Sequence, residues 1–403
     1  MLLINGTICD YSGIKKADIR IKDDKITHIN TTLSQEENEI VIDCKDKFIF
    51  PALIDLGIYP KNKTLSSQTL QTLSKKCFGG GVGSILLYAD CNPKTNTESI
   101  IELANLINHT LPQNIFSSIY PFDSNNKISN IASLKNLGGS AIHIHSQLLE
   151  GQNLLTLTHY ANMLDIPFIS IPYDTELAQG VIDEGILATR LGLPSIPPIA
   201  WEKEIIRMCA ISANTKNKML LTLTNAFEYV TFFNSKGADI TTQTPIHHLI
   251  LNESSYENYA TKAKMFPPLK SKENQESLIK KLQQGEIKCL TSLQNATYNS
   301  QKDEVFELAS CGVDIINHYF SLLYTFFVKT NIISLPKLLE LCAKNQADFL
   351  KLKKGQIACD FDADLIIVDL ESSFICEDSY SPYFNQTLFS KIQKTILGGK
   401  IYE

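Results

Sequence analysis

The stretch FPALIDLGIY (residues 50–59) marks the point where the chain changes its hydrophobic pattern. Upstream, residues 1–50 alternate apolar and polar positions in short bursts, with Asn5-Gly6 and Asp23-Asp24 as expected hairpin turns. Downstream, from residue 51 to about residue 350, apolar strands alternate with amphipathic segments of helix length. This alternation predicts a parallel sheet of β/α units.

The expected elements follow from that pattern. Strands are predicted at SILLYA (84–89), SAIHIH (140–145), PFISI (167–171), KMLLTLT (218–224), DITTQ (239–243) and IKCLTSL (287–293), with helices at 98–111 and 335–345 among others. The tail returns to strand patterns at 355–371 and 395–403. We therefore predict an α/β fold: a TIM-like (β/α)8 barrel at residues 51–350, with a small β-sandwich domain built from residues 1–50 and 351–403.

Composition limits the classes of function. The chain is 44% hydrophobic and 20% charged, with a net charge of -6 and no cluster of Lys and Arg, so neither a nucleic acid nor an anionic membrane is an expected partner. We find no secretory signal pattern at the N-terminus and no run of about 18 apolar residues that would span a membrane. The ten cysteines form no CxxC pair, which predicts reduced, mostly buried thiols and a cytoplasmic location.

Several stretches together carry a resemblance to a known family. They are FIFPALIDL (48–56), GGVGSILLYADCNP (80–93), DEGILATRLGLPSIP (183–197), HHLIL (247–251), MFPPLKS (265–271), GQIACDFDADLIIVD (355–369) and SPY (381–383). On these, the chain resembles the amidohydrolase superfamily and, within it, the dihydroorotases, especially the long bacterial type. RLGLPSIP and PPLKS are specific to dihydroorotase-like members, whereas the 355–369 stretch is shared by many amidohydrolases. The resemblance implies the barrel fold and hydrolysis of a cyclic amide by one or two divalent metals at the C-terminal mouth.

The same resemblance shows that the metal ligands have been replaced. The family's ligands and water-orienting carboxylate come from separate strand ends, and here those positions hold Gly57, Tyr59, Ile171, Thr222 and Leu293. An aliphatic side chain has no lone pair and cannot accept a proton. We therefore expect no catalytic residue, no metal and no cofactor. Because several of the replacements are bulky or apolar, we also predict a partly collapsed, dry pocket at the strand ends.

One alternative stays open at the mouth. His143 and His145 stand where the family has a metal-bridging carboxylate, and on a strand residues i and i+2 face the same way. A degenerate zinc site at this pair is conceivable, although no second cluster of ligand residues completes a coordination shell. His247 and His248 match a His-His pair of the family, and we expect them to be structural.

Substrate-binding positions have changed as well. Lys61 replaces a family arginine, Asp90 and Phe266 each replace an asparagine, and Gln294 replaces the histidine that follows the catalytic aspartate. Lys61, Asp90 and Gln294 remain possible ligand-binding residues. No GxSxG elbow offers a metal-free nucleophile, and the Asp90 carboxylate beside Cys91 is expected to raise the pKa of that thiol.

The expected fold is that of the family, but the residues expected to bind the metals and the substrate have changed. We therefore predict a non-catalytic dihydroorotase homologue. Homologues of this kind in several bacteria resemble this chain in lacking the ligands, and they are held to assemble with aspartate carbamoyltransferase. The resemblance therefore implies an oligomeric assembly partner in de novo pyrimidine biosynthesis. Two alternatives remain: an active dihydroorotase or other cyclic-amide amidohydrolase with an atypical zinc site, and a ligand-binding sensor without chemistry.

Overall fold

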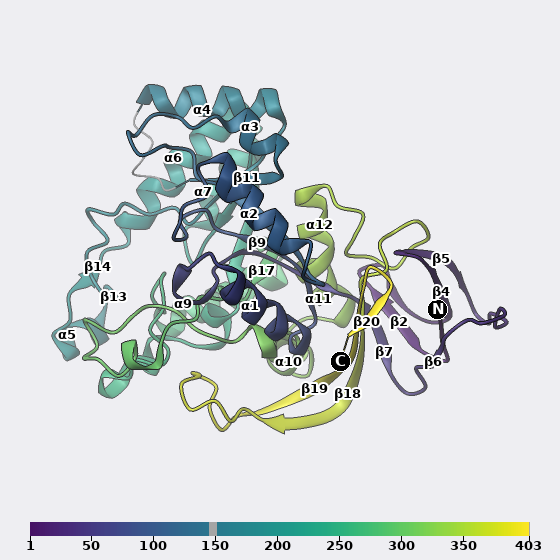
Figure 1. Cartoon of the computed structure of the whole chain (residues 1–403). Helices are drawn as coiled ribbons and strands as arrows, with labels where there is room; N and C mark the ends of the chain where they lie inside the picture. Colours follow the sequence, from purple (N-terminus) through teal and green to yellow (C-terminus); the bar gives the residue numbers. More distant parts are fainter. Residues whose placement is uncertain (145–150, 403) are drawn as a thin grey trace.

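The computed structural model describes residues 1–144 and 151–402. Its largest sheet consists of parallel strands that follow one another in chain order (Figure 1): β8 (Leu53–Ile58), β9 (Val82–Leu87), β10 (Asn114–Ile119), β11 (Gly139–His143), β12 (Phe168–Ser170), β15 (Lys218–Thr222), β16 (Asp239–Pro245) and β17 (Cys289–Thr291). The first and last strands meet through the loops that follow them, where the Tyr59 N–H donates to the Gln294 carbonyl at 2.8 Å. This contact completes the predicted TIM-like barrel.

The strands are apolar because both of their faces are covered. Every residue of β8 and β9 is buried, as expected for a parallel sheet wrapped by helices. The outer helices include α1 (Ser67–Gly79), α2 (Glu98–Asn108), α3 (Ile131–Asn136), α4 (Gly151–Leu164), α6 (Ile199–Thr215), α7 (Phe227–Ser235), α9 (Lys272–Gln283), α11 (Leu335–Leu339) and α12 (Asn345–Leu350). Among the described residues, no helix combines the length and the apolar character that a membrane span requires.

Both ends of the chain contribute to two further sheets (Figure 1). One has the order β5 (Lys25–Asn30), β4 (Asp18–Lys22), β1 (Leu2–Ile4), β6 (Val41–Asp43), and the other has the order β20 (Lys400–Tyr402), β19 (Thr387–Leu397), β18 (Leu365–Ile375), β7 (Phe48–Pro51), β2 (Thr7–Asp10), β3 (Gly13–Lys16). Leu3 and Ile19 from the first sheet share a core with Ile49, Leu365 and Ile396 from the second. The predicted β-sandwich of both termini is therefore present.

Local details differ from the sequence prediction. Asp23-Asp24 forms the expected two-residue hairpin turn, since Lys22 pairs with Lys25 across it. Asn5-Gly6 instead carries the chain from β1 in one sheet to β2 in the other, so the hairpin prediction is wrong there. Strand β10 was not predicted because NIFSSI contains two serines, yet both are buried and the Ser118 hydroxyl donates to the Leu87 carbonyl of β9.

A long ribbon formed by β18 and β19 runs from the terminal sheets along the barrel (Figure 1). It is fixed along its length, because the Phe389 N–H donates to the Thr325 hydroxyl at 2.8 Å. Beyond its end, the Tyr383 hydroxyl lies 2.7 Å from His247 Nδ1. The SPY stretch thus connects the C-terminal ribbon to the short helix α8 (His247–Ile250) that follows β16.

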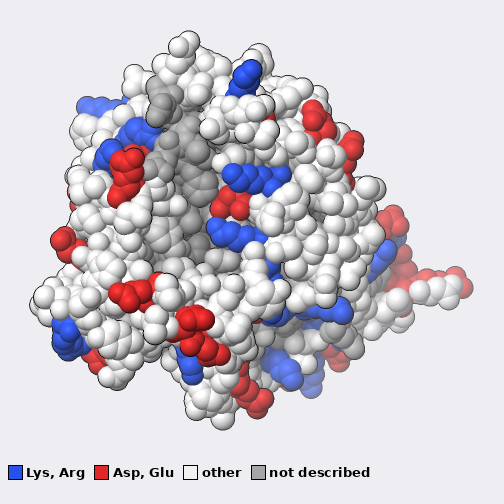
Figure 2. All heavy atoms as spheres, turned by 60° about the vertical axis from the view of Figure 1, so that its left-hand side comes forward, with Lys and Arg blue, Asp and Glu red and all other residues white. Residues whose placement is uncertain are grey.

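On the face that Figure 2 shows, basic and acidic side chains are interspersed.

Candidate functional site at the barrel mouth

The barrel brings the five positions for which the resemblance implies metal ligands or a water-orienting carboxylate to the C-terminal ends of its strands. Gly57 lies in β8, with Tyr59 just beyond it, and Thr222 is the last residue of β15. Ile171 follows β12 and Leu293 follows β17. All of these side chains are buried. The strand ends therefore converge as in a catalytic barrel, with different side chains at the centre.

A tyrosine ring occupies the space beside Gly57. The backbone of Gly57 has φ +76°, and a Cβ atom built there would lie 2.5 Å from Cζ and 2.6 Å from the hydroxyl oxygen of Tyr88. Tyr88, which follows β9, is only 1% exposed and lies 3.2 Å from the Thr222 hydroxyl. No side chain at residue 57, histidine included, fits this place unless Tyr88 moves.

Asp90 is bound by donors of the chain itself. The Tyr59 hydroxyl donates to its Oδ1 at 2.7 Å, and the Lys63 ammonium lies 2.9 Å from its Oδ2. Lys63 Nζ is also 4.0 Å from the centre of the Tyr59 ring. Burial, followed by the Asp90 charge, holds the pKa of Tyr59 well above its usual value, so Tyr59 stays protonated and donates. An ammonium, a phenol and a carboxylate thus contact one another at the mouth, and of the three residues only Tyr59 stands at a position where the resemblance implies a metal ligand.

His143 belongs to this network. Its Nδ1 accepts the Ala89 N–H at 3.2 Å and lies 3.4 Å from Asp90 Oδ1, while its ring is 4.4 Å from that of Tyr88. His145, the other member of the proposed pair, lies outside the described residues. Among the described residues, no group of three or more His, Cys, Asp or Glu side chains is placed to hold a metal ion. The donors present here do not fit the family's divalent metal.

The described residues at the mouth line one small cavity. A cavity of about 70 Å³ is lined by Tyr59, Lys63, Ile171, Tyr173, Met265, Phe266, Leu293, Asn295 and Gly312. Phe266 helps to fill the mouth, since its ring lies 4.7 Å from that of Tyr173 and 5.4 Å from that of Trp201. Ligand pockets usually measure roughly 300–1,000 Å³. This cavity, lined by described residues, is smaller than an ordinary ligand pocket, and the collapse of the whole strand-end pocket stays a prediction.

Comparison with known proteins identifies the family. No protein-family model matches the chain. A probable dihydroorotase-like protein of Helicobacter pylori is 32% identical over 403 residues, which covers 99% of this chain and 97% of that protein. The chain belongs to the dihydroorotase-like family. A dihydroorotase of Caldanaerobacter subterraneus is 25% identical over 421 residues, covering 100% of this dihydroorotase-like chain and 96% of the relative.

Solved structures support the same fold. The L-hydantoinase (dihydropyrimidinase) from Arthrobacter aurescens superposes with a TM-score of 0.87 at 18% identity, over 99% of this dihydroorotase-like chain and 95% of the hydantoinase. A D-hydantoinase superposes with a TM-score of 0.83 at 21% identity. At such identities the likeness shows the fold alone, a barrel with an added β domain.

All three possible ligand-binding residues, Lys61, Asp90 and Gln294, lie outside the cavity lining. Lys61 Nζ lies 4.6 Å from the centre of the Tyr298 ring. The Gln294 amide donates to Asp314 Oδ1 at 2.8 Å, and its carbonyl accepts the Ile315 N–H at 2.9 Å. The lysine that does line the cavity is Lys63. Sequence reasoning missed it, although it follows Lys61 by two residues in the same loop.

The other polar groups near the mouth are bound by neighbours. His247 Nε2 lies 3.0 Å from the Ser292 carbonyl, and burial lowers its pKa to about 4. His248 Nε2 lies 3.1 Å from the Pro267 carbonyl, and burial lowers its pKa to about 3. The pKa of Cys91 is raised to about 12, first by burial and then by Asp90. The predicted direction for Cys91 is confirmed, but burial is the main cause.

A buried carboxyl group beneath the mouth gives a test by pH. Asp55 of β8 accepts the Thr291 hydroxyl at 2.6 Å and the Ser292 N–H at 3.2 Å, and burial raises its pKa to about 6 despite these bonds. The folded chain then binds this proton more tightly than the unfolded chain, so the free energy of unfolding falls as pH rises toward that pKa. We expect this fall to be about 1 kcal/mol between about pH 5 and about pH 7.

The Asp55→Asn variant should lose this pH-dependent part of the free energy of unfolding. The measurement is urea unfolding of both proteins across that pH range, read as the difference between their two curves so that other titrating groups cancel. Curves that stay parallel would contradict the raised pKa of Asp55.

Proposed function

We propose that this chain is a non-catalytic member of the dihydroorotase-like family that serves as a structural partner in an assembly. The observation that carries the proposal is the Tyr88 ring in the place of any side chain at Gly57. Ile171, Thr222 and Leu293 provide no imidazole or carboxylate at the other strand ends. Activating a water molecule for amide hydrolysis requires a metal or a general base, and this centre presents neither in the family's positions.

The backbone at Leu293 adds support. Its φ is +48°, a left-handed conformation that Asp and Asn adopt more readily than leucine. The resemblance places an aspartate at this position. A backbone kept in that conformation around a leucine fits a site that descends from a catalytic one and no longer needs its carboxylate.

The two alternatives have less support. An atypical zinc site rests on His143 and His145, but His143 Nδ1 already accepts a backbone N–H and neighbours Asp90. A sensor that binds a cyclic amide in the old pocket needs room, and the cavity of about 70 Å³ is a small fraction of an ordinary ligand pocket.

As the partner we propose aspartate carbamoyltransferase, on the resemblance described above. Apolar side chains on outer helices offer contact area for a protein: Leu106 of α2 is 66% exposed and Met163 of α4 is 70% exposed. Exposed apolar groups of this size are enriched where proteins meet. A structural role of this kind depends on the outer surface of the barrel. It does not require metal ligands at the centre.

The assembly can be measured directly. We expect the purified chain, mixed with the carbamoyltransferase from the same source, to elute as one species whose mass by light scattering equals a sum of both chains. Each protein alone and a mixture with an unrelated carbamoyltransferase serve as controls. Separate elution at every concentration tested would refute the assembly role.

A further inference from the structure

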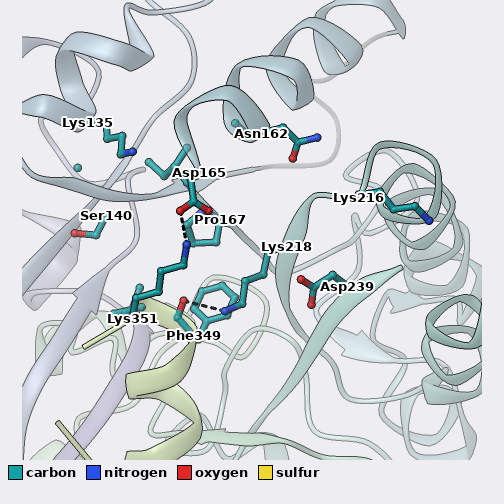
Figure 3. Close-up of a pocket in the computed structure, with 14 residues that line it drawn as sticks. Lys135, Ser140, Asn162, Asp165, Pro167, Lys216, Lys218, Asp239, Phe349 and Lys351 are labelled. Atoms are coloured by element: carbon teal, nitrogen blue, oxygen red, sulfur yellow. Dashed lines mark hydrogen bonds and ion pairs between the residues drawn. The ribbon is translucent and has the colours of Figure 1, made fainter. Parts of the chain in front are cut away.

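Figure 3 shows a second, larger cavity. Because it lies where strands of the barrel begin, it is at the opposite end of the barrel from the mouth. It is formed where β11, β12, β15 and β16 begin and where α12 ends, and its volume is about 520 Å³. Its lining is Lys135, Gly139, Ser140, Ala161, Asn162, Asp165, Ile166, Pro167, Lys216, Lys218, Asp239, Phe349, Leu350 and Lys351. This volume falls within the range of about 300–1,000 Å³ that is usual for small-molecule sites.

The charges around this cavity are predominantly basic, although the chain as a whole carries a net charge of -6. Four lysines line it against two aspartates. Lys351 and Asp165 form an ion pair, which leaves Lys135, Lys216 and Lys218 opposite Asp239. The field inside the cavity therefore favours an anion.

Lys218 is the best placed of these cations. It is half-buried, and its ammonium lies 3.2 Å from the Phe349 carbonyl (Figure 3). The same ammonium lies 3.3 Å from the Asp348 carbonyl. Burial lowers its pKa, so the charged form gains stability when an anion approaches. Lys135 is held in place by the Leu164 carbonyl. An ammonium carries three N–H donors, so both lysines have capacity for a ligand.

Part of the lining is apolar. Ala161, Ile166, Pro167 and Leu350 line the cavity together with the charged groups. An inorganic ion would leave these apolar side chains uncovered, whereas a carbon skeleton attached to the anionic group would cover them. Lysine binds phosphate as a point charge. We propose that this cavity binds a small phosphorylated organic metabolite, with Lys218 and Lys135 as the ligands of its phosphate.

Ribose 5-phosphate is a suitable probe, with ribose as the control that lacks the charge. We expect calorimetry with the full-length chain at low ionic strength to give saturable binding of ribose 5-phosphate and none of ribose. Lys218→Met should weaken binding about tenfold or more, because it removes a charged hydrogen-bond donor. Asp239→Asn should strengthen binding several-fold, because it removes the opposing charge from the cavity.

The control for overall charge is Lys15→Met, since Lys15 is exposed on β3, in the sheet of the chain ends. It should leave the affinity unchanged. Should Lys218→Met fail to fold, Lys135→Met provides the same test. Absence of saturable binding, equal weakening by Lys15→Met, or binding of pyrophosphate without binding of ribose 5-phosphate would overturn the proposal.

Discussion

Replacing Gly57 by alanine should destabilise the chain by about 3 kcal/mol or more, or prevent it from folding. Two costs combine at this residue. Its φ of +76° lies in the left-handed region, and the new Cβ would lie 2.5 Å from the Tyr88 ring. That ring is fully buried, so it has no open space in which to move. The loss is measured as the free energy of unfolding in urea.

Gly285 provides a matched control. Its φ is also +76°, but a Cβ built there meets no atom within 4 Å. Gly285→Ala therefore carries the backbone cost alone, about 1 kcal/mol. Equal losses in the two variants would show that the Tyr88 ring does not fill the space beside residue 57. By the same argument, Gly57→His with Tyr59→His should restore no hydrolysis.

Removing the buried lysine Lys270 should have a comparably large effect. Lys270 Nζ lies 2.7 Å from Asp183 Oδ1, and the two residues are 4% and 5% exposed. Lys270 also lies 5.5 Å from the centre of the Trp201 ring. Lys270→Met would leave the Asp183 carboxylate buried without its cation, which typically costs about 3–5 kcal/mol.

The double variant separates the ion pair from packing. Adding Asp183→Asn to Lys270→Met removes the unpaired charge, so much of the lost stability should return. Denaturant unfolding of the two single variants and the double variant measures the coupling. Additive losses would mean that the pair does not stabilise the fold in the way its burial implies.

This ion pair explains why two family-specific stretches persist in a chain with a degenerate centre. Asp183 begins DEGILATRLGLPSIP, and Lys270 lies in MFPPLKS. The buried contact ties these stretches together, so we expect both to contribute to the stability of the fold whether or not the chain has an activity. The motifs that identify the family are here partly structural.

The fold was predictable because it depends on periodicity. The apolar strands from β8 to β17 and the strand-rich chain ends give clear patterns. The failures have local causes. The two buried serines of β10 hide its apolar character, and only the Ser118 hydroxyl is bound within the sheet. Asn5-Gly6 turns between sheets because β1 pairs with β4 and β6, whereas β2 pairs with β3 and β7.

The site was only partly predictable. Strand ends must converge at one end of a barrel, so the positions of Gly57, Tyr59 and Thr222 could be predicted together. The side chains that fill the centre could not be predicted. No sequence rule indicates that the Tyr88 ring lies beside Gly57 or that Lys63 contacts Asp90. These contacts depend on side-chain directions that only the folded structure determines.

The central claim is that the mouth no longer supports metal-dependent hydrolysis. The most direct test is turnover of dihydroorotate and of carbamoyl aspartate by the purified chain with added zinc, alone and with the carbamoyltransferase. We expect no rate above the protein-free control, and no change in His143→Ala. Zinc-dependent turnover that disappears in His143→Ala would contradict the account.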